Sequence, residues 1–143
     1  MPSKGYRFLE HTADLRFNSY GKTLGECFSN AARAMYASMI DPSSVETKEE
    51  KAVALEAGSL DMLLHDWLTE ALLLFEMEGM VFAQFGVSIE EAAERWVLKA
   101  TLGGERFDPK KHSILNEIKA VTYHGLSVKK EGDVWVAEVL CDI

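Results

Sequence analysis

Residues 60–77, which read LDMLLHDWLTEALLLFEM, have the clearest periodicity in the chain. Apolar side chains recur there at intervals of three and four, the spacing of one face of an α-helix. They are Leu60, Leu63, Leu64, Trp67, Leu68, Ala71, Leu72 and Phe75. Gly58 and Ser59 precede the stretch and Gly79 follows it, as expected at helix boundaries. The pattern predicts an amphipathic helix that buries a wide apolar stripe.

Residues 23–40 predict a second amphipathic helix. Thr23 and Glu26 fit a capping box, in which each side chain accepts a hydrogen bond from the other residue's backbone N–H. Asp41 and Pro42 stop the helix, because proline cannot continue it. The stripe consists of Leu24, Cys27, Phe28, Ala31, Ala32, Met35, Tyr36 and Met39.

The other apolar segments have strand patterns, and they are bounded by polar or glycine-containing breaks. The predicted strands are residues 6–11, 15–20, 52–57, 81–89, 95–102, the second half of 117–125, and 134–143. Residues 103–108 are expected to begin as a turn. Together with the two helices, these strands predict an α+β fold. We expect a single two-layer domain over residues 1–143, with both helices packed on one mainly antiparallel sheet of about seven strands.

The last two predicted strands suggest a hairpin that brings polar groups together. The segment between them, residues 130–133, has the chemistry of a hairpin turn. In the expected register residue 121 faces residue 142. Asp142 then shares a face with Lys119, its diagonal neighbour at roughly 7–8 Å.

Asp14 follows His11, Thr12 and Ala13 in a predicted turn and admits two interpretations. A turn aspartate often bonds its own backbone. Alternatively, it belongs to a cation site that Asp142 and the carboxylate of Ile143 complete. Oxygen ligands of this kind suit Ca²⁺, Mg²⁺ or Mn²⁺ better than Zn²⁺.

The basic residues near these aspartates also admit two interpretations each. Lys119 is either a solvated strand lysine or a partner for Asp142 or an anion. His11 and His124 are either ordinary hydrogen-bonded histidines or ligands.

Composition restricts the classes of function. The net charge of −8 and the pI near 5.0 disfavour independent binding to nucleic acid or to anionic membranes. The sequence contains no secretory, transit or membrane-spanning segment, so we expect a cytoplasmic protein. It also has no nucleotide-binding glycine motif, nucleophile elbow or Cys-x-x-Cys pair.

Five segments together resemble the archease family along nearly the whole chain. They are residues 8–14 (FLEHTAD), 63–72 (LLHDWLTEAL), 104–105 (GE), 117–124 (EIKAVTYH) and 141–143 (CDI). Thr69 and Ala71 depart slightly from the usual helix motif, where Asn and Leu are common.

The resemblance implies an accessory protein rather than an enzyme. Archeases assist the GTP-dependent tRNA-splicing RNA ligase, which joins 3′-phosphate or 2′,3′-cyclic-phosphate ends to 5′-hydroxyl ends. They promote guanylylation of the ligase and its multiple turnover. By analogy Asp14, Asp142 and Ile143 hold a divalent metal ion, and Lys119, His11 and His124 are functional neighbours. RNA is then reached only through the ligase.

Two alternatives come from other classes. One is a small metal-dependent hydrolase or nucleotidyl enzyme that uses the same carboxylates. The other is a chaperone-like module that modulates RNA-modifying enzymes through the apolar surface of its helices. The first predicts turnover by the isolated chain, and the second predicts that Asp14 and Asp142 are dispensable.

Overall fold

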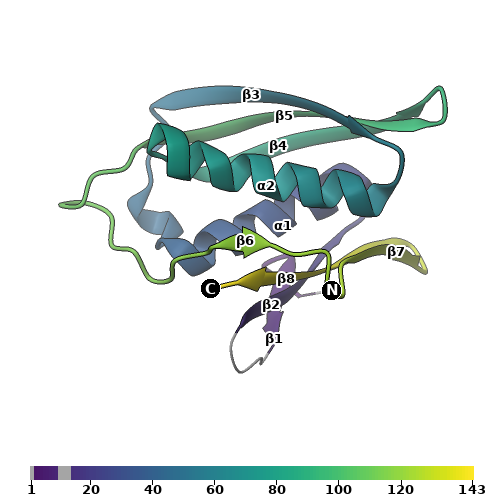
Figure 1. Cartoon of the computed structure of the whole chain (residues 1–143), viewed down its shortest axis with the longest axis horizontal. Helices are drawn as coiled ribbons and strands as arrows, with labels where there is room; N and C mark the ends of the chain where they lie inside the picture. Colours follow the sequence, from purple (N-terminus) through teal and green to yellow (C-terminus); the bar gives the residue numbers. More distant parts are fainter. Residues whose placement is uncertain (1, 10–13) are drawn as a thin grey trace.

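Two α-helices lie between two antiparallel β-sheets in the computed structural model of the chain, which describes residues 2–9 and 14–143 (Figure 1). The helices are α1 (Leu24–Met39) and α2 (Leu60–Glu78). One sheet contains β3 (Glu49–Ala57), β5 (Arg95–Arg106) and β4 (Met80–Ala92), in that order. The other contains β1 (Tyr6–Leu9), β2 (Asp14–Gly21), β8 (Val134–Asp142), β6 (Ala120–Val121) and β7 (Ser127–Glu131). A short 3₁₀ turn, Pro42–Ser44, follows α1.

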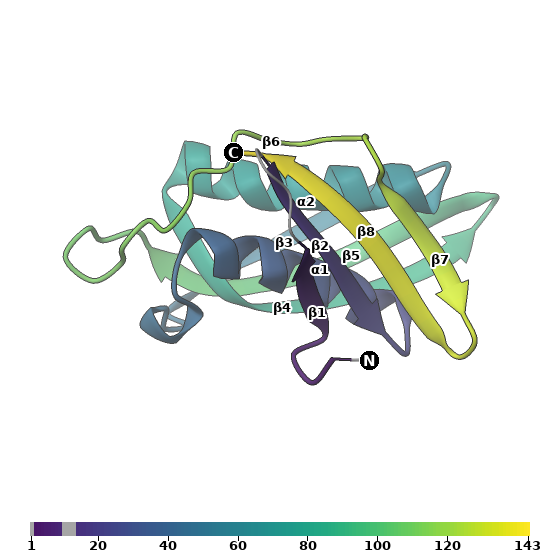
Figure 2. The ribbon, with the colours of Figure 1, turned by 90° about the horizontal axis from the view of Figure 1, so that it is seen from below.

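The predicted α+β class, with two helices on antiparallel strands, is confirmed, while the layering differs from the prediction. The described residues form eight strands, and these divide into two sheets rather than one. Figure 2 shows the five-stranded sheet covering the helices from one side, and the three-stranded sheet lies behind them. Neither described helix is long and apolar enough to cross a membrane.

The start of α1 has the predicted cap, with one difference. Thr23 Oγ1 accepts a hydrogen bond from the Glu26 N–H at 3.0 Å. The Glu26 carboxylate reaches back one residue further than expected, to the Lys22 N–H at 3.4 Å. Thr23 therefore satisfies one N–H group that the first turn of the helix leaves unpaired, whereas Glu26 binds a donor that precedes the cap.

Helix α1 is buried on more than the single predicted stripe because a sheet lies on each side of it. Small residues of α1 allow the helix to contact the three-stranded sheet closely. A Cβ built on Gly25 would lie 2.2 Å from the carbonyl oxygen of Val87 in β4. Asn30, Ala34 and Ser38 are also buried, although they lie outside the predicted stripe.

Helix α2 joins α1 through polar contacts inside the apolar core. The Trp67 side chain is fully buried, and its Nε1–H donates to the Phe28 carbonyl at 2.9 Å. The Tyr36 hydroxyl donates to the Ala71 carbonyl. These bonds satisfy the polar atoms of large buried aromatic residues, so both rings can contribute their apolar area to the core.

The closing hairpin differs from the predicted one. β7 pairs with β8 through a two-residue turn at Gly132 and Asp133, where Gly132 has a φ of 65°. The predicted strand at residues 117–125 contributes only β6, which pairs further along β8. Gly125 has a φ of 67°, a conformation that glycine adopts easily, and the chain turns between the two short strands there.

The turn expected at residues 103–108 is also wrong, because Gly103 and Gly104 lie within β5. A Cβ on Gly104 would lie 1.8 Å from the Val81 carbonyl oxygen of the neighbouring strand. The pairing of β4 with β5 shifts between Phe82 and Gln84, a bulge beside this position. The glycine permits close approach of two backbones rather than a reversal of the chain.

Glu105, which follows this glycine, is a buried carboxylate that anchors the loop after β5. It is 4% exposed, and its Oε2 accepts from the Glu46 N–H at 2.9 Å and from His112 Nε2 at 3.0 Å. The Asp108 N–H donates to His112 Nδ1, so the proton of the imidazole lies on Nε2. Lys111 Nζ lies 2.9 Å from the same carboxylate oxygen. The bond from the Glu46 N–H, together with Lys111 and His112, lowers the pKa of Glu105 to about 2.

We expect Gly25→Ala to destabilise the fold by roughly 1–3 kcal/mol, because the added methyl forces α1 away from β4. The midpoint of urea unfolding measures the loss. Gly58→Ala is the matched control, since its Cβ would meet nothing within 4 Å, and we expect a change within about 0.5 kcal/mol. Equal effects of the two substitutions would contradict the close packing of α1.

We expect Glu105 to contribute to stability at neutral pH and to lose this contribution in acid. Its pKa is lower in the folded chain than the ordinary value of 4.5, so the stabilisation is complete above about pH 4.5 and disappears as the pH falls toward 2. Glu105→Gln should lose roughly 1.5–3 kcal/mol at pH 7 and show a weaker dependence on pH in this window. Urea unfolding from pH 7 to pH 2.5 tests this, with the exposed Glu90→Gln as control. An unchanged acid dependence in Glu105→Gln would refute it.

Candidate functional site

The carboxyl end of β8 brings Asp14 and Asp142 together. The two residues are direct partners in the antiparallel pairing of β2 with β8. Side chains of such partners lie on the same face of the sheet, with their Cβ atoms roughly 4.5–5.5 Å apart. Asp142 is also the partner of Ala120 in β6, so three strands meet at this level. Residues that are more than a hundred positions apart in the sequence thus form one acidic pair.

Both carboxylates belong to the face of the sheet that points away from the helices. The neighbouring Cys141 is fully buried, and side chains alternate along a strand, so Asp142 points outward. Asp142 is exposed and Asp14 is half-buried. Burial raises the pKa of the Cys141 thiol to about 12. The acidic pair therefore offers oxygen ligands on the outer face, and the thiol lies on the other side.

The oxygen ligands at this position are of the kind that a hard divalent cation prefers, although they are few. Like charges in directly opposed positions repel, and a cation between them would remove that cost. The third oxygen group predicted from the sequence is the carboxylate of Ile143, which follows Asp142 and is 40% exposed. Within residues 2–9 and 14–143 no three His, Cys, Asp or Glu side chains come together as a metal cluster. Two side chains and one terminus would leave several of the six to eight positions of a calcium ion for other ligands.

Lys119 lies beside the acidic pair, but the predicted register is wrong by one residue. Ala120, not Val121, faces Asp142, and Val121 faces Cys141. The Lys119 N–H donates to the Asp142 carbonyl at 2.8 Å. The contact that the structure gives is therefore made by the backbone of Lys119, which directly precedes β6. The predicted shared face of Lys119 and Asp142 is wrong, because Ala120 is the residue that shares a face with Asp142.

Helix α2 holds β6 against β8. His65 Nε2 donates to the Val121 carbonyl at 3.0 Å, and the imidazole stacks on the Tyr123 ring with centroids 3.8 Å apart. On the other side, the Thr122 N–H donates to the Leu140 carbonyl at 3.1 Å. A strand of two residues is thus held from two directions. The resemblance singled out the segment that contains His65, but its contact with β6 depends on tertiary structure.

His124 lines a pocket of about 290 Å³ next to the acidic pair. Arg16, Glu138 and Leu140 form the strand side of this pocket, and Gly125 lies beside His124. Arg16 is two residues from Asp14 on the same face of β2, which is a distance of about 7 Å. Arg16 and Glu138 were missed from the sequence, because their spacing from Asp14 and Asp142 has meaning only once β2 and β8 are paired. His11 lies outside the described residues.

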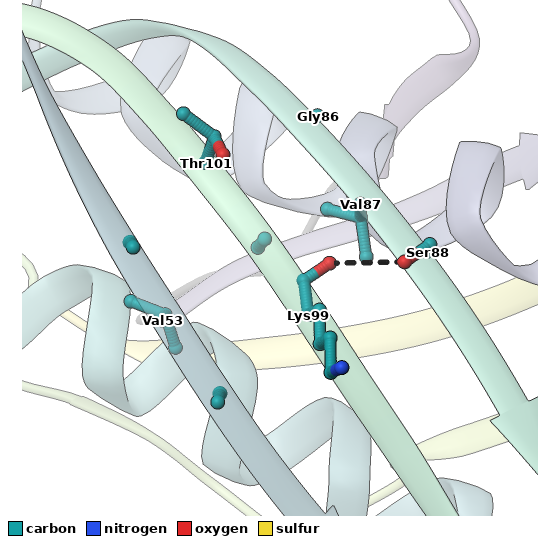
Figure 3. A pocket seen from close by; sticks show the side chains of 9 residues that line it. Val53, Gly86, Val87, Ser88, Lys99 and Thr101 are labelled. Atoms are coloured by element: carbon teal, nitrogen blue, oxygen red, sulfur yellow. Dashed lines mark hydrogen bonds between the residues drawn. The ribbon is translucent and has the colours of Figure 1, made fainter.

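A larger hollow, of about 590 Å³, lies on the opposite side of the molecule, on the outer face of the three-stranded sheet (Figure 3). Its exposed lining is mostly small: Ala52, Ala54, Gly86, Ser88 and Thr101, with Lys99 among them. The Ser88 hydroxyl donates to the Lys99 carbonyl at 3.5 Å. This hollow contains no carboxylate and no histidine, so the candidate site remains at the end of β8.

A family model and individual relatives of known sequence point to the same protein family. Residues 6–143 match the model of the archease protein family. The chain is 45% identical to Protein archease of Methanosarcina acetivorans, with 100% of both chains covered. It is 38% identical to Protein archease of Pyrococcus abyssi, with 98% of this chain and 99% of the relative covered.

Two solved structures have the same fold. The solution structure of a Methanobacterium thermoautotrophicum protein superimposes with a TM-score of 0.89 at 38% identity, and the match covers 98% of this chain and 99% of that chain. A crystal structure from Thermotoga maritima, described as an archease and possible chaperone, gives a TM-score of 0.60 at 22% identity. At that identity the second likeness concerns the fold alone.

We expect His65→Phe to loosen β6 without unfolding the domain. Phenylalanine can keep the stack on Tyr123 but cannot donate to the Val121 carbonyl, a loss of about 1 kcal/mol. Hydrogen exchange of the Lys119 and Thr122 amides should then become roughly fivefold faster. The amides of α1 serve as the internal control and should keep their rates. A uniform acceleration throughout the chain would contradict this local role.

Proposed function

The chain belongs to the archease family, and we propose that it is the accessory protein that activates a GTP-dependent tRNA-splicing RNA ligase. In this role it promotes guanylylation of the ligase and its multiple turnover. One observation carries the proposal: Asp14 and Asp142 face each other across β2 and β8 on an exposed sheet face. This is where the resemblance expects a divalent metal ion.

Asp14 and Asp142 would hold the ion, with the carboxylate of Ile143 beside them. Ca²⁺, Mg²⁺ and Mn²⁺ are the candidates, because all the proposed ligands are oxygen atoms. Such an ion supplies charge neutralisation for phosphate oxygens during nucleotidyl transfer. Lys119 adds a positive charge at the start of β6.

An accessory role explains the open form of this site better than independent catalysis does. Asp142 is exposed and Asp14 is half-buried at the end of the paired strands β2 and β8. Two side-chain carboxylates and one terminus would leave other positions of the ion to groups of the ligase or its nucleotide. The net charge of −8 disfavours independent contact with RNA, which we therefore expect to be reached through the ligase.

Asp142→Asn should abolish stimulation of the ligase while it leaves the fold intact, because Asp142 is exposed and the amide has nearly the same shape. We also expect the affinity for Mn²⁺ to fall on the order of tenfold or more, since the site loses a charged ligand. The measurements are guanylylation of the RNA ligase of the same organism, with substoichiometric chain, and Mn²⁺ binding by paramagnetic resonance.

Asp133→Asn is the matched control, since Asp133 lies in the turn before β8, at the other end of the strand. It should stimulate as the wild type does. Normal stimulation of the ligase by Asp142→Asn would refute the proposed role of a metal ion at Asp14 and Asp142. If both variants instead retain an activity that protects unfolded protein, the chaperone-like alternative would replace the ligase proposal. Turnover of nucleotide by the isolated chain would favour the enzyme alternative.

A further inference from the structure

The pocket that Arg16 and His124 line is the strongest feature that the proposed function leaves without a role. Its volume is about 290 Å³, and it opens on the same sheet face as the acidic pair. We propose that it binds a phosphate monoester group, and that binding requires the divalent ion held by Asp14 and Asp142. This inference rests on the proposed function and adds a ligand to it.

Arg16 supplies the main recognition group. Its side chain is exposed, and its guanidinium makes no hydrogen bond or ion pair within the part of the chain that the structure describes. A guanidinium presents a planar set of donors that fits two phosphate oxygens at once. The register fixes its position, because Arg16 faces Leu140, the residue two positions before Asp142. Arg16 is therefore a diagonal neighbour of Asp142 at roughly 7–8 Å, which leaves room for one phosphate group.

His124 also lines the pocket, and it follows β6, which lies on the other side of β8 from the strand that carries Arg16. Its backbone N–H donates to Thr122 Oγ1 at 3.2 Å, and Thr122 is bonded to the Leu140 carbonyl. The loop that carries the imidazole is thus fixed to the strand that carries Asp142. An imidazole N–H there adds a second donor, on the side of the pocket away from Arg16.

The charges around the pocket explain why the ion is required. Glu138 lines the pocket beside Arg16, so a carboxylate accompanies the guanidinium there, and Asp142 lies two residues beyond Leu140 on the same strand face. A free phosphate would be repelled by this face. A divalent ion held by Asp14 and Asp142 would supply positive charge on this face, near the guanidinium of Arg16, and would favour a phosphate there. Binding of the ion and of the phosphate should consequently be cooperative in both directions.

The phosphate has two sources in the proposed reaction, a guanine nucleotide or the 3′-phosphate end of an RNA that the ligase holds. Guanosine 5′-monophosphate and uridine 3′-monophosphate represent the two sources. Each is titrated into the full chain in Mg²⁺ and in EDTA, and amide shifts in ¹H–¹⁵N spectra report the binding. We expect shifts at Arg16 and His124, with an affinity roughly tenfold or more higher in Mg²⁺. Tighter binding of one probe identifies the source, and equal binding indicates a site for the phosphate group alone.

Arg16→Gln should weaken phosphate binding roughly tenfold and leave Mn²⁺ affinity, measured without phosphate, within about twofold of wild type. Arg7→Gln is the control, because Arg7 is an exposed arginine in β1 that faces Asn18 and lies outside the pocket. Phosphate binding that is independent of Mg²⁺, or unchanged by Arg16→Gln, overturns the inference. In that case Asp142-dependent stimulation of the ligase can still stand. Absence of Mn²⁺ binding by the wild type would overturn both proposals together.

Discussion

The antiparallel register between β2 and β8 is the constraint on which the candidate site depends. It runs from Asp14 opposite Asp142 to Gly21 opposite Trp135, without a bulge. Because side chains alternate along a strand, a slip of one residue would turn over one of the two strands: it would bury either Asp14 or Asp142 and expose either Phe17 or Cys141. Those two residues are fully buried, and the cost of exposing them enforces the register. The pairing of β2 with β8 thus places core residues on one face of the sheet and the candidate site on the other.

The two helices pack on the sheets in different ways, and both arrangements support the candidate site. Helix α1 lies between them and is buried on most sides, which requires small residues such as Gly25 and Ala34. Helix α2 buries Trp67 and five of its leucines, while two of its polar residues, Asp61 and His65, reach the five-stranded sheet. The Asp61 carboxylate accepts from the Val128 N–H, and His65 donates to Val121. Helix α2 therefore contributes to the core and also holds β6 and β7 in place.

Charged groups are used in two different ways in this fold. Glu105 is buried, and its carboxylate is fully occupied by a backbone N–H, a lysine and a histidine, so its role is structural. Asp142 and Arg16 are exposed on a sheet face beside a pocket, where a ligand can reach them. Both kinds of residue occur in or near segments that resemble the family. Burial and partners distinguish them, whereas resemblance alone does not.

The sequence by itself determined the two helices, most strand positions, the α+β class and the family. Periodicity, capping residues and breaks are local signals, and residues 23–40 and 60–77 contain all of them. The division into two sheets, the position of Gly104 within β5, the pairing of Ala120 with Asp142 and the pocket at Arg16 were decided only by tertiary structure. Each of them depends on which distant strands pair and in which register. That choice is made by the packing of whole faces, which no local segment encodes.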